Sequence, residues 1–143
     1  MILDEMRREN MEQVYALMTQ LEGGESLPRA GFECAFDAYL TDPDVAGIVV
    51  REAERICGFA SVHTRLLMHH AAPVSELQEL VVAEDCRGQG LGRMLLDAAR
   101  QEAIRRGSPQ LELCCNRNNA PAHEFYQHCG IQWTHKKYLW RPE

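Results

Sequence analysis

Residues 76–92, which read ELQELVVAEDCRGQGLG, constrain the fold more than any other part of the sequence. An alternating, strand-like stretch ends at Val82, glycines occupy alternate positions from Gly88 to Gly92, and apolar residues at helical spacing follow. Backbone N–H groups of such a strand–turn–helix can converge at the helix N-terminus, where they bind anions such as phosphate. We expect an anion-binding turn here. The alternative is a glycine-rich turn that only lets the helix pack closely on the strand.

Two familiar nucleotide-binding motifs do not fit this turn. The dinucleotide fingerprint G-x-G-x-x-G, if it began at Gly88, would need glycine at position 93, where the sequence has Arg93. The phosphate loop G-x-x-x-x-G-K-[ST] does not occur in the sequence. What remains is R-G-x-G-x-G, in which Arg87 adds a charge-assisted donor to the main-chain N–H groups.

The rest of the chain alternates between helix and strand signals. A strand–helix–strand unit around the glycine turn predicts a parallel strand pair, whereas the strands before it predict an antiparallel hairpin. The sequence therefore indicates an α/β fold: a mixed, mostly antiparallel sheet with a central parallel pair, flanked by helices. We expect helices at 10–21, 28–40, 90–106 and 118–129, strands at 46–50, 56–64, 75–82 and 111–115, a turn at 51–55, a loop at 65–73, and one or two strands in the tail, 133–142.

Composition limits the domain organisation and the partners. The 143 residues, 45% hydrophobic and 25% charged, are typical of one globular domain spanning residues 1–143. A net charge of −6 without a basic stripe argues against nucleic acid and anionic membranes as partners. No apolar run approaches the roughly 18 residues of a membrane span, and the first ten residues do not resemble a signal peptide. Because the six cysteines form no C-x-x-C pair, we expect reduced thiols and a cytoplasmic location.

Two longer motifs frame the second half of the chain. The first is L-x-V-x₄-R-G-x-G-L-G, from Leu80 to Gly92, and the second is N-x-x-A-x-x-F-Y-x-x-x-G, from Asn119 to Gly130. Both resemble signatures of the GNAT superfamily of N-acetyltransferases. The resemblance covers about residues 12–140. A narrower resemblance, to the aminoalkylphosphonate N-acetyltransferases, lies in VYAL near the start, His69-His70, ELQELVV at 76–82 and AH-x-FY at 122–126. These resemblances imply an acetyl-CoA-dependent enzyme that transfers acetyl directly to a small primary amine, which in the narrower group carries a phosphonate.

The GNAT resemblance also implies which residues hold acetyl-CoA. The glycine turn would bind the pyrophosphate of coenzyme A, and the strand before it would pair with the pantetheine arm through its main chain. An N–H group at the end of that strand could polarise the thioester carbonyl. The residues implied are Leu80, Val81, Val82, Arg87, Gly88, Gln89, Gly90, Leu91, Gly92, Arg93, Asn119, Ala122 and Tyr126.

Acetyl transfer needs a proton donor for the leaving thiolate and a base for the amine. The family's general acid is a tyrosine that matches Tyr126, whose helical spacing places it on one face with Asn119 and Ala122. For the base we prefer Glu76, because alignment on Val82 and Arg87 puts it where many relatives keep a glutamate. Glu79 is the competing base.

The two glutamates differ in their expected environment. Strand alternation predicts that Glu76 and Glu79 lie on opposite faces of the strand. For either residue the non-catalytic alternative is a salt bridge at a strand edge. A buried tyrosine with a purely structural role is the corresponding alternative for Tyr126.

Basic side chains gather where the family's fold borders the acceptor pocket. His63, Arg65, His69 and His70 are the candidates for binding the substrate's anionic group. A divalent metal bridging the histidines to the substrate is conceivable, but we expect no metal, because adjacent histidines on a strand point apart. A covalent mechanism through Cys86 is the remaining chemical alternative, although no Cys/His pair is legible from the sequence.

The sequence does not identify the acceptor amine. Alternative acceptors are an amino acid, a polyamine or a protein amine, and an alternative of another class is a non-catalytic module that binds acyl-CoA. The C-terminal segment could support a homodimer.

Overall fold

A computed structural model describes residues 1–25 and 27–143. The described chain divides into two compact units, residues 1–112 and residues 113–143. The glycine turn belongs to the first unit and Tyr126 to the second.

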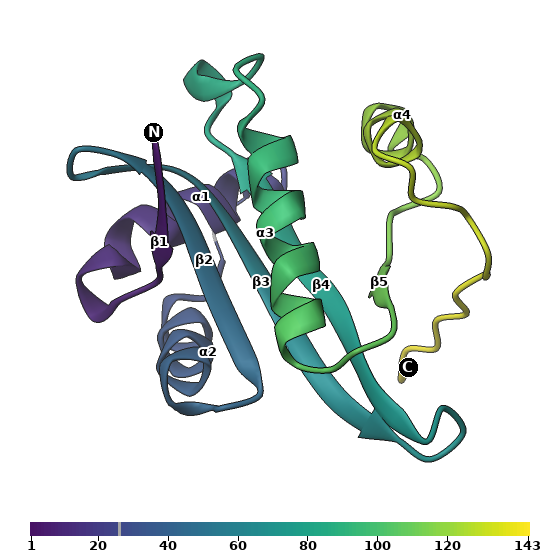
Figure 1. The fold of residues 1–143 in the computed structure, drawn as a ribbon. Helices are drawn as coiled ribbons and strands as arrows, with labels where there is room; N and C mark the ends of the chain where they lie inside the picture. The colour runs from purple at the N-terminus through teal and green to yellow at the C-terminus, as the bar shows by residue number, and fades with distance from the viewer. Residues whose placement is uncertain (26) are drawn as a thin grey trace. The chain divides into compact units, whose positions relative to one another are not determined.

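A five-stranded sheet in the order β1-β2-β3-β4-β5 forms the centre of the first unit (Figure 1). Strands β1 to β4 are antiparallel to their neighbours, and β4 and β5 form the parallel pair. The predicted class of sheet is therefore confirmed, with its parallel pair at one edge. The strands are β1 Ile2–Glu5, β2 Val45–Glu52, β3 Arg55–Leu67, β4 Ala72–Val82 and β5 Leu111–Leu113.

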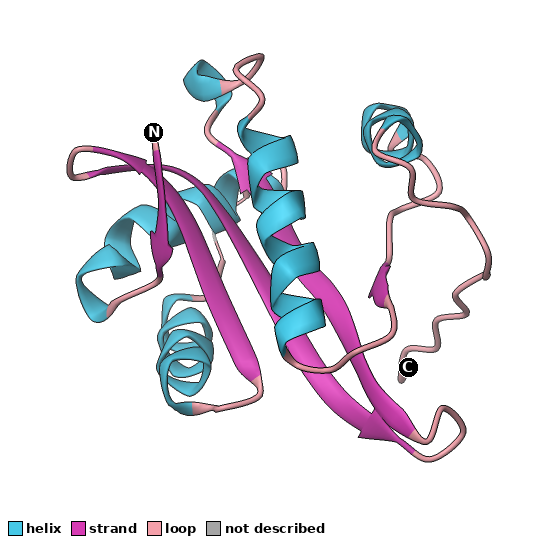
Figure 2. Cartoon of the chain, in the orientation of Figure 1, coloured by secondary structure: helices cyan, strands magenta, loops and turns pink. Residues whose placement is uncertain are grey.

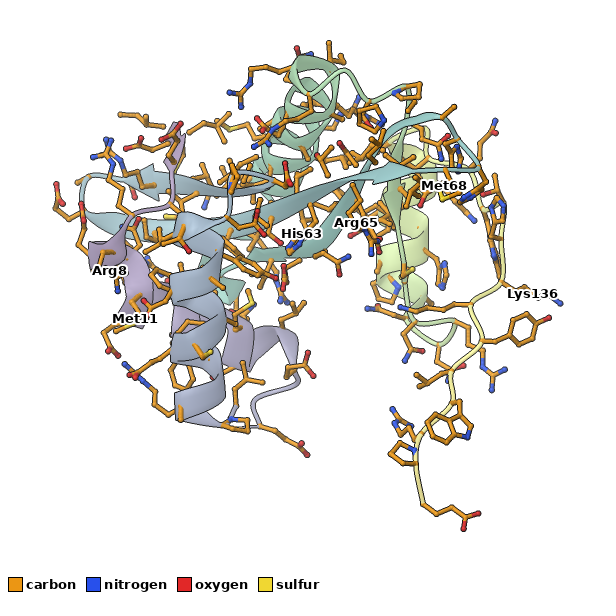
Figure 3. All side chains as sticks on the ribbon, turned by 90° about the horizontal axis from the view of Figure 1, so that it is seen from below. Arg8, Met11, His63, Arg65, Met68 and Lys136 are labelled. Atoms are coloured by element: carbon orange, nitrogen blue, oxygen red, sulfur yellow. The ribbon has the colours of Figure 1, made fainter. Side chains whose placement is uncertain are left out.

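Helices cover both faces of this sheet. Helices α1 and α2 lie on one side and α3 on the other, as Figure 3 shows from below. Each buries an apolar stripe, such as Val14 and Leu17 of α1 or Leu95 and Ala99 of α3. In the part of the chain that the structure describes, no helix combines the length and apolar character needed to cross a membrane. The elements are η1 Arg8–Asn10, α1 Met11–Leu21, α2 Arg29–Thr41, η2 Glu84–Cys86 and α3 Leu91–Arg105.

Both hairpins close more tightly than the sequence predicts. The expected turn at 51–55 shrinks to two residues, since β2 runs to Glu52 and β3 begins at Arg55. The expected loop at 65–73 shrinks to 68–71, because β3 and β4 extend into it. The physical reason lies in Ala53 and Ala71, which both take a φ of 50° and so allow the tight reversal of the chain.

The second unit contains helix α4, Ala120–His128. Asn119 caps it, with its side-chain oxygen accepting the Ala122 N–H at 3.3 Å. The prediction of one or two strands at 133–142 is wrong: the described tail contains none. A strand needs a partner strand to pair with, and Leu113 is all that this unit contributes to β5. Local bonds form instead, such as Trp133 Nε1 donating to the His135 carbonyl at 3.0 Å.

Candidate active site

The glycine turn lies between η2 and α3, where Figure 2 shows it as a loop. Gly88 and Gly90 take φ values of 77° and 79°, in the left-handed region that disfavours side chains. A Cβ added to either would meet nothing within 4 Å. These two glycines are therefore required by the backbone conformation, which brings the chain around to the helix, and the space beside them is open.

Three N–H groups at the start of α3 lie before the helix's first internal bond. That bond runs from the Met94 N–H to the Gly90 carbonyl at 3.0 Å. The N–H groups of Leu91, Gly92 and Arg93 therefore have no acceptor inside the helix. They carry the positive end of the helix dipole, beside the exposed Arg87. This donor set fits a phosphate or pyrophosphate group.

The end of β4 presents main-chain groups at the edge that faces away from β3. The Ala83 N–H donates to the Cys57 carbonyl at 2.8 Å, so alternation turns the N–H and carbonyl of Val82 to the opposite edge. Gln20 of α1 occupies that carbonyl with its Nε2 at 2.9 Å and accepts the Glu84 N–H at 3.2 Å. The Val82 carbonyl is thus held by α1, and the Val82 N–H is the edge donor nearest the glycine turn.

A β-bulge in β4 overturns the expectation that the two glutamates lie on opposite faces. Ser61 of β3 pairs with Glu79 and Val62 pairs with Leu77, which leaves Gln78 as an extra residue. Two residues beyond Ser61, His63 pairs with Glu76. Residues directly opposite in an antiparallel pair share a face. Glu76 and Glu79 therefore lie on the same face of the sheet, the one with Ser61 and His63.

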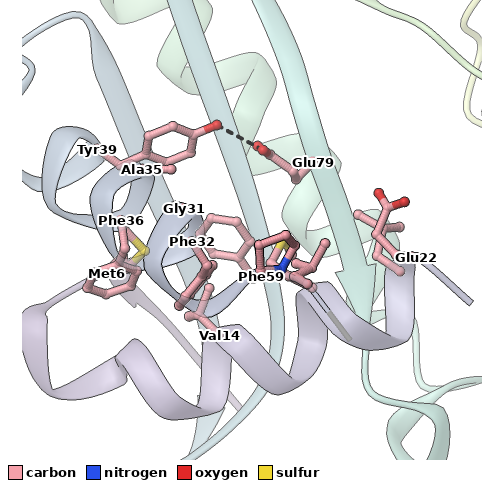
Figure 4. Close-up of a pocket in the computed structure, with 14 residues that line it drawn as sticks. Met6, Val14, Glu22, Gly31, Phe32, Ala35, Phe36, Tyr39, Phe59 and Glu79 are labelled. Carbon is pink, nitrogen blue, oxygen red and sulfur yellow. Dashed lines mark hydrogen bonds between the residues drawn. The ribbon is translucent and has the colours of Figure 1, made fainter. Parts of the chain in front are cut away.

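Glu79 is held by two hydroxyl groups. The Tyr39 hydroxyl donates to Oε1 at 2.8 Å, marked by the dashed line in Figure 4, and the Ser61 hydroxyl donates to Oε2. Burial and the neighbouring Glu79 charge raise the pKa of Tyr39, so this phenol stays protonated and remains a donor. Tyr39 falls within the helix expected at 28–40, but no sequence signal marked it or Ser61 as part of the site.

Glu76 forms an ion pair with one of the predicted substrate residues. Arg65 Nη2 lies 3.0 Å from Glu76 Oε2, and the Arg65 side chain is 64% exposed whereas that of Glu76 is 17% exposed. His63 lies opposite Glu76 and packs edge-on against the Tyr39 ring, with centroids 4.8 Å apart. The buried His63 Nε2 has no hydrogen-bond partner among the described residues. The structure thus brings His63, Arg65 and both glutamates together.

The other predicted substrate residues lie elsewhere. His69 and His70 occupy the turn at 68–71, at the tip of the β3–β4 hairpin, and their rings contact each other at 4.3 Å. The predicted loop around them became strand, which carries the tip away from the glutamates. Among residues 1–25 and 27–143, no group of three or more His, Cys, Asp or Glu side chains is placed to hold a metal ion.

Tyr126 lies on α4 in the second unit, where it is half-buried. Burial, together with the nearby thiols of Cys115 and Cys129, raises its pKa to about 12. The phenol is therefore protonated throughout the neutral range. Asn119 uses its side chain as the cap of α4, which gives it a structural role besides the predicted cofactor contact.

The cysteines do not favour a covalent mechanism. Cys86 is buried beside the glycine turn, and burial together with its hydrogen bond to Cys57 raises its pKa to about 11. At neutral pH this thiol is protonated and so a poor nucleophile. Burial also raises the pKa of the Cys115 thiol.

An apolar pocket of about 370 Å³ opens between α1, α2 and the glutamate face of the sheet (Figure 4). The sequence does not reveal this pocket, because its walls come largely from apolar helical residues whose spacing is that of an ordinary core. Glu22, Tyr39 and Glu79 supply its polar groups. The lining residues are Met6, Val14, Met18, Leu21, Glu22, Leu27, Pro28, Gly31, Phe32, Ala35, Phe36, Tyr39, Phe59 and Glu79.

Comparisons with known proteins agree with this geometry. An aminoalkylphosphonate N-acetyltransferase of Salmonella typhimurium is 35% identical over 130 residues, which are 91% of this chain and 84% of the relative. An aminoglycoside N-acetyltransferase, AAC(6')-Iy, solved with CoA, superimposes with a TM-score of 0.87 at 19% identity, covering 99% and 93% of the two chains. A ribosomal-protein-alanine N-acetyltransferase of Brucella melitensis gives a TM-score of 0.80 at 16% identity, with 99% of each chain covered.

These two structural likenesses show the fold, and the sequence relationship shows the family. The family model described as the acetyltransferase (GNAT) family matches residues 4–131, most of the chain. The chain therefore belongs to the GNAT family and is an acetyl-CoA-dependent N-acetyltransferase.

Proposed function

We propose that this enzyme transfers the acetyl group of acetyl-CoA directly to the primary amine of a small molecule. The observation that carries this proposal is the glycine turn, whose left-handed Gly88 and Gly90 leave open space beside the free N–H groups of α3. Direct transfer needs no acyl-enzyme, which agrees with the protonated, buried Cys86. The chain's own residues then have three tasks: to hold the cofactor, to deprotonate the amine and to protonate the leaving group.

Holding the cofactor falls to the glycine turn and the edge of β4. The N–H groups from Gln89 to Arg93 and the Arg87 guanidinium would take the pyrophosphate. Leu80, Val81 and Val82 would run beside the pantetheine arm, with the Val82 N–H directed at the thioester carbonyl. Acetyl-CoA supplies the acetyl group and a thiol leaving group. Holding the two substrates in the right orientation can lower the activation barrier by roughly 7–11 kcal/mol.

Deprotonating the amine falls to a carboxylate on the glutamate face. A free alkylamine has a pKa near 10.4, so it arrives as an ammonium ion and must lose a proton before it attacks. Glu76 is our choice for the base. Its Oε2 accepts the Arg65 bond, whereas Oε1 has no hydrogen-bond partner among the described residues and can take the proton, directly or through water. In Glu79 each oxygen already accepts a hydroxyl bond.

Protonating the departing thiolate falls to Tyr126. A thiol has a pKa near 8.5, whereas the pKa of Tyr126 is about 12. The phenol still carries its proton at the pH values at which a thiol begins to ionise. The phenol therefore donates a hydrogen bond to the developing thiolate as charge builds there.

The first acceptor to test is an aminoalkylphosphonate. The support for it is the Salmonella relative, whose name states that substrate, together with Arg65, an exposed cation beside Glu76. Of the predicted histidines, His63 lies opposite Glu76 and remains a candidate for contact with the same group, whereas His69 and His70 lie at the hairpin tip. An amino acid, a polyamine and a protein amine are the alternative acceptors.

A thiol-release assay tests the proposed function. The enzyme is incubated with acetyl-CoA and a panel of primary amines, and free coenzyme A is measured, while calorimetry measures CoA binding without turnover. We expect CoA binding and amine-dependent thiol release. Binding without any amine-dependent release would instead favour a non-catalytic acyl-CoA module, and no binding at all would overturn the cofactor assignment.

Amide variants distinguish the two glutamates. The base sets the acidic limb of the pH–rate profile. Glu76→Gln should therefore abolish that limb and lower kcat/KM about 10²–10⁴-fold. Glu79→Gln should keep the limb. The reverse pattern would make Glu79 the base.

A further inference from the structure

The pocket between α1, α2 and the sheet has the dimensions of a small-molecule site. Its volume of about 370 Å³ lies within the usual range of such sites, roughly 300–1,000 Å³. Phe32 and Phe36 of α2 and Phe59 of β3 supply its aromatic walls (Figure 4). Most of its wall is hydrocarbon, and one side bears the Tyr39–Glu79 pair.

The charged groups of this pocket are of one sign. Glu79 and Glu22 are its carboxylates, and none of the described residues that line it is Lys, Arg or His. Arg65, a cation on the glutamate face, is engaged with Glu76 and is not part of the lining. The pocket therefore attracts a cation and does not compensate an anion.

Glu79 is built to hold a cationic head group. The Tyr39 and Ser61 hydroxyls fix the carboxylate in one orientation at the pocket wall. Each carboxylate oxygen can accept a second hydrogen bond, and an ammonium ion has three donors. A primary ammonium at Glu79 would thus keep its charge paired while the rest of the molecule lies against Phe32, Phe36 and Phe59.

We infer that the acceptor is a primary amine with an uncharged hydrocarbon body, aromatic or aliphatic, whose ammonium group is held by Glu79. This inference rests on the proposed function and names the substrate class of the same enzyme. A phosphonate would carry a charge of about −1.5 to −2, as a phosphate monoester does. Burying it among phenylalanines beside two carboxylates is costly. The pocket thus favours an acceptor other than the one that the Salmonella relative is named for.

A direct competition between two amines tests the inference. Phenethylamine and 2-aminoethylphosphonate are assayed with acetyl-CoA by thiol release, and their binding is measured by calorimetry. We expect kcat/KM for phenethylamine to exceed that for 2-aminoethylphosphonate by about 100-fold, since only the phosphonate brings an unpaired charge into the pocket. Equal or better use of 2-aminoethylphosphonate overturns the inference and leaves the proposed function intact.

Gly31 allows the pocket to be filled without disturbing the fold. A Cβ added at Gly31 would meet just the Pro28 Cβ, at 4.0 Å, and the residue lies on helix α2. Gly31→Leu should raise KM for phenethylamine about tenfold or more, because the new side chain takes space that the substrate needs. Ala38→Leu, on the same helix outside the pocket, is the matched control and should leave KM unchanged.

Replacing the anchor completes the test. Glu79→Gln should raise KM for phenethylamine at least about tenfold, because a charge-assisted bond becomes a neutral one. CoA affinity should stay the same in Gly31→Leu and Glu79→Gln. If neither variant changes KM, the pocket does not hold the acceptor and the inference fails. If the unaltered enzyme binds no CoA and releases no thiol with any amine, the proposed function itself fails.

Discussion

At the scale of single residues, Gln78 decides the arrangement of the site. Strict alternation along β4 would separate Glu76 and Glu79 by a whole sheet thickness, and the sequence alone gives no reason to doubt it. The extra residue in the β3–β4 ladder reverses the alternation between them. Both carboxylates then face α2, where Tyr39 reaches one of them. Bulges follow from how two strands pair, so a single strand's pattern does not reveal them.

The raised pKa of Tyr126 should make the stability of the protein depend on pH in the alkaline range. Its pKa is raised to about 12, whereas an unfolded tyrosine titrates near 10. As pH rises from 10 to 12, the unfolded state loses this proton first, so the folded state binds more protons and its stability falls. We expect Tyr126→Phe to abolish this part of the alkaline loss of stability. The measurement is the free energy of unfolding between pH 9 and 12.

The same variant tests the catalytic role of Tyr126. If the phenol protonates the leaving thiolate, Tyr126→Phe should lower kcat by about 10²-fold or more without abolishing CoA binding. Tyr138→Phe is the control, since that side chain is 90% exposed and should change neither quantity. An unchanged kcat in Tyr126→Phe would assign the tyrosine a structural role.

At the scale of elements, α3 has a left-handed glycine at each end. Gly90 precedes the helix and Gly107 follows it, with φ values of 79° and 72°, and an added Cβ meets nothing within 4 Å at either. Alanine at either position should therefore lower the free energy of unfolding by about 1–2 kcal/mol, through the backbone conformation alone. Gly90→Ala should in addition weaken CoA binding, and Gly107→Ala should not. Equal CoA affinity in the two variants would remove the glycine turn from the cofactor site.

Gly58 of β3 is required for a different reason, which is lack of space. A Cβ there would lie 3.0 Å from the Leu95 side chain of α3, from the Val50 side chain and from the Val81 carbonyl. Gly58→Ala should lower the free energy of unfolding by about 1–3 kcal/mol, because the helix must move off the sheet. Gly31→Ala, in a helix with room for the methyl group, should raise it by up to about 1 kcal/mol. Urea denaturation measures both, and a neutral Gly58→Ala would show that α3 can shift.

The elements predicted from periodicity are those whose burial is local. Each of the four helices carries its own apolar stripe or cap signals, and all four appear within a few residues of the expected bounds. The three strands of the hairpins were placed correctly but too short, because Ala53 and Ala71 take left-handed conformations in the turns, whereas the strand expected at 111–115 ends earlier, at Leu113. The prediction of strands in the tail was wrong. The tail sequence is compatible with a strand, but a strand forms only against a partner strand, and the described tail has none.

At the scale of the whole molecule, the two GNAT motifs lie in different compact units. The glycine turn belongs to residues 1–112 and Tyr126 to residues 113–143. The sequence identified both motifs because each is local, and it identified the cofactor for the same reason. The apolar pocket is lined by Met6, which lies between β1 and η1, and by residues of two helices and two strands. Such a site exists only after folding, so the acceptor could not be read from the spacing of residues.

Cofactor binding should be visible in the stability of the whole chain. A ligand that binds only the folded state at 100 times its Kd adds about 2.7 kcal/mol, which for a chain of this size corresponds to a rise in Tm of roughly 5–10 °C. The overall charge of −6 opposes an anionic ligand, so the affinity must come from the local donors at the start of α3 and from Arg87. We expect CoA to raise Tm in a concentration-dependent way, measured by differential scanning calorimetry.

Arg87→Met separates this local attraction from the general effect of charge. Losing one charge-assisted bond should weaken CoA binding about tenfold or more, so the same CoA concentration should give a much smaller rise in Tm. Arg8→Met removes the same charge from an exposed pair with Asp37 and should keep the full rise. If both variants lose the rise equally, net charge rather than the turn controls binding. If Arg87→Met alone loses it, the positive N-terminus of α3 and its adjacent guanidinium overcome the repulsion of an acidic protein for an anionic cofactor.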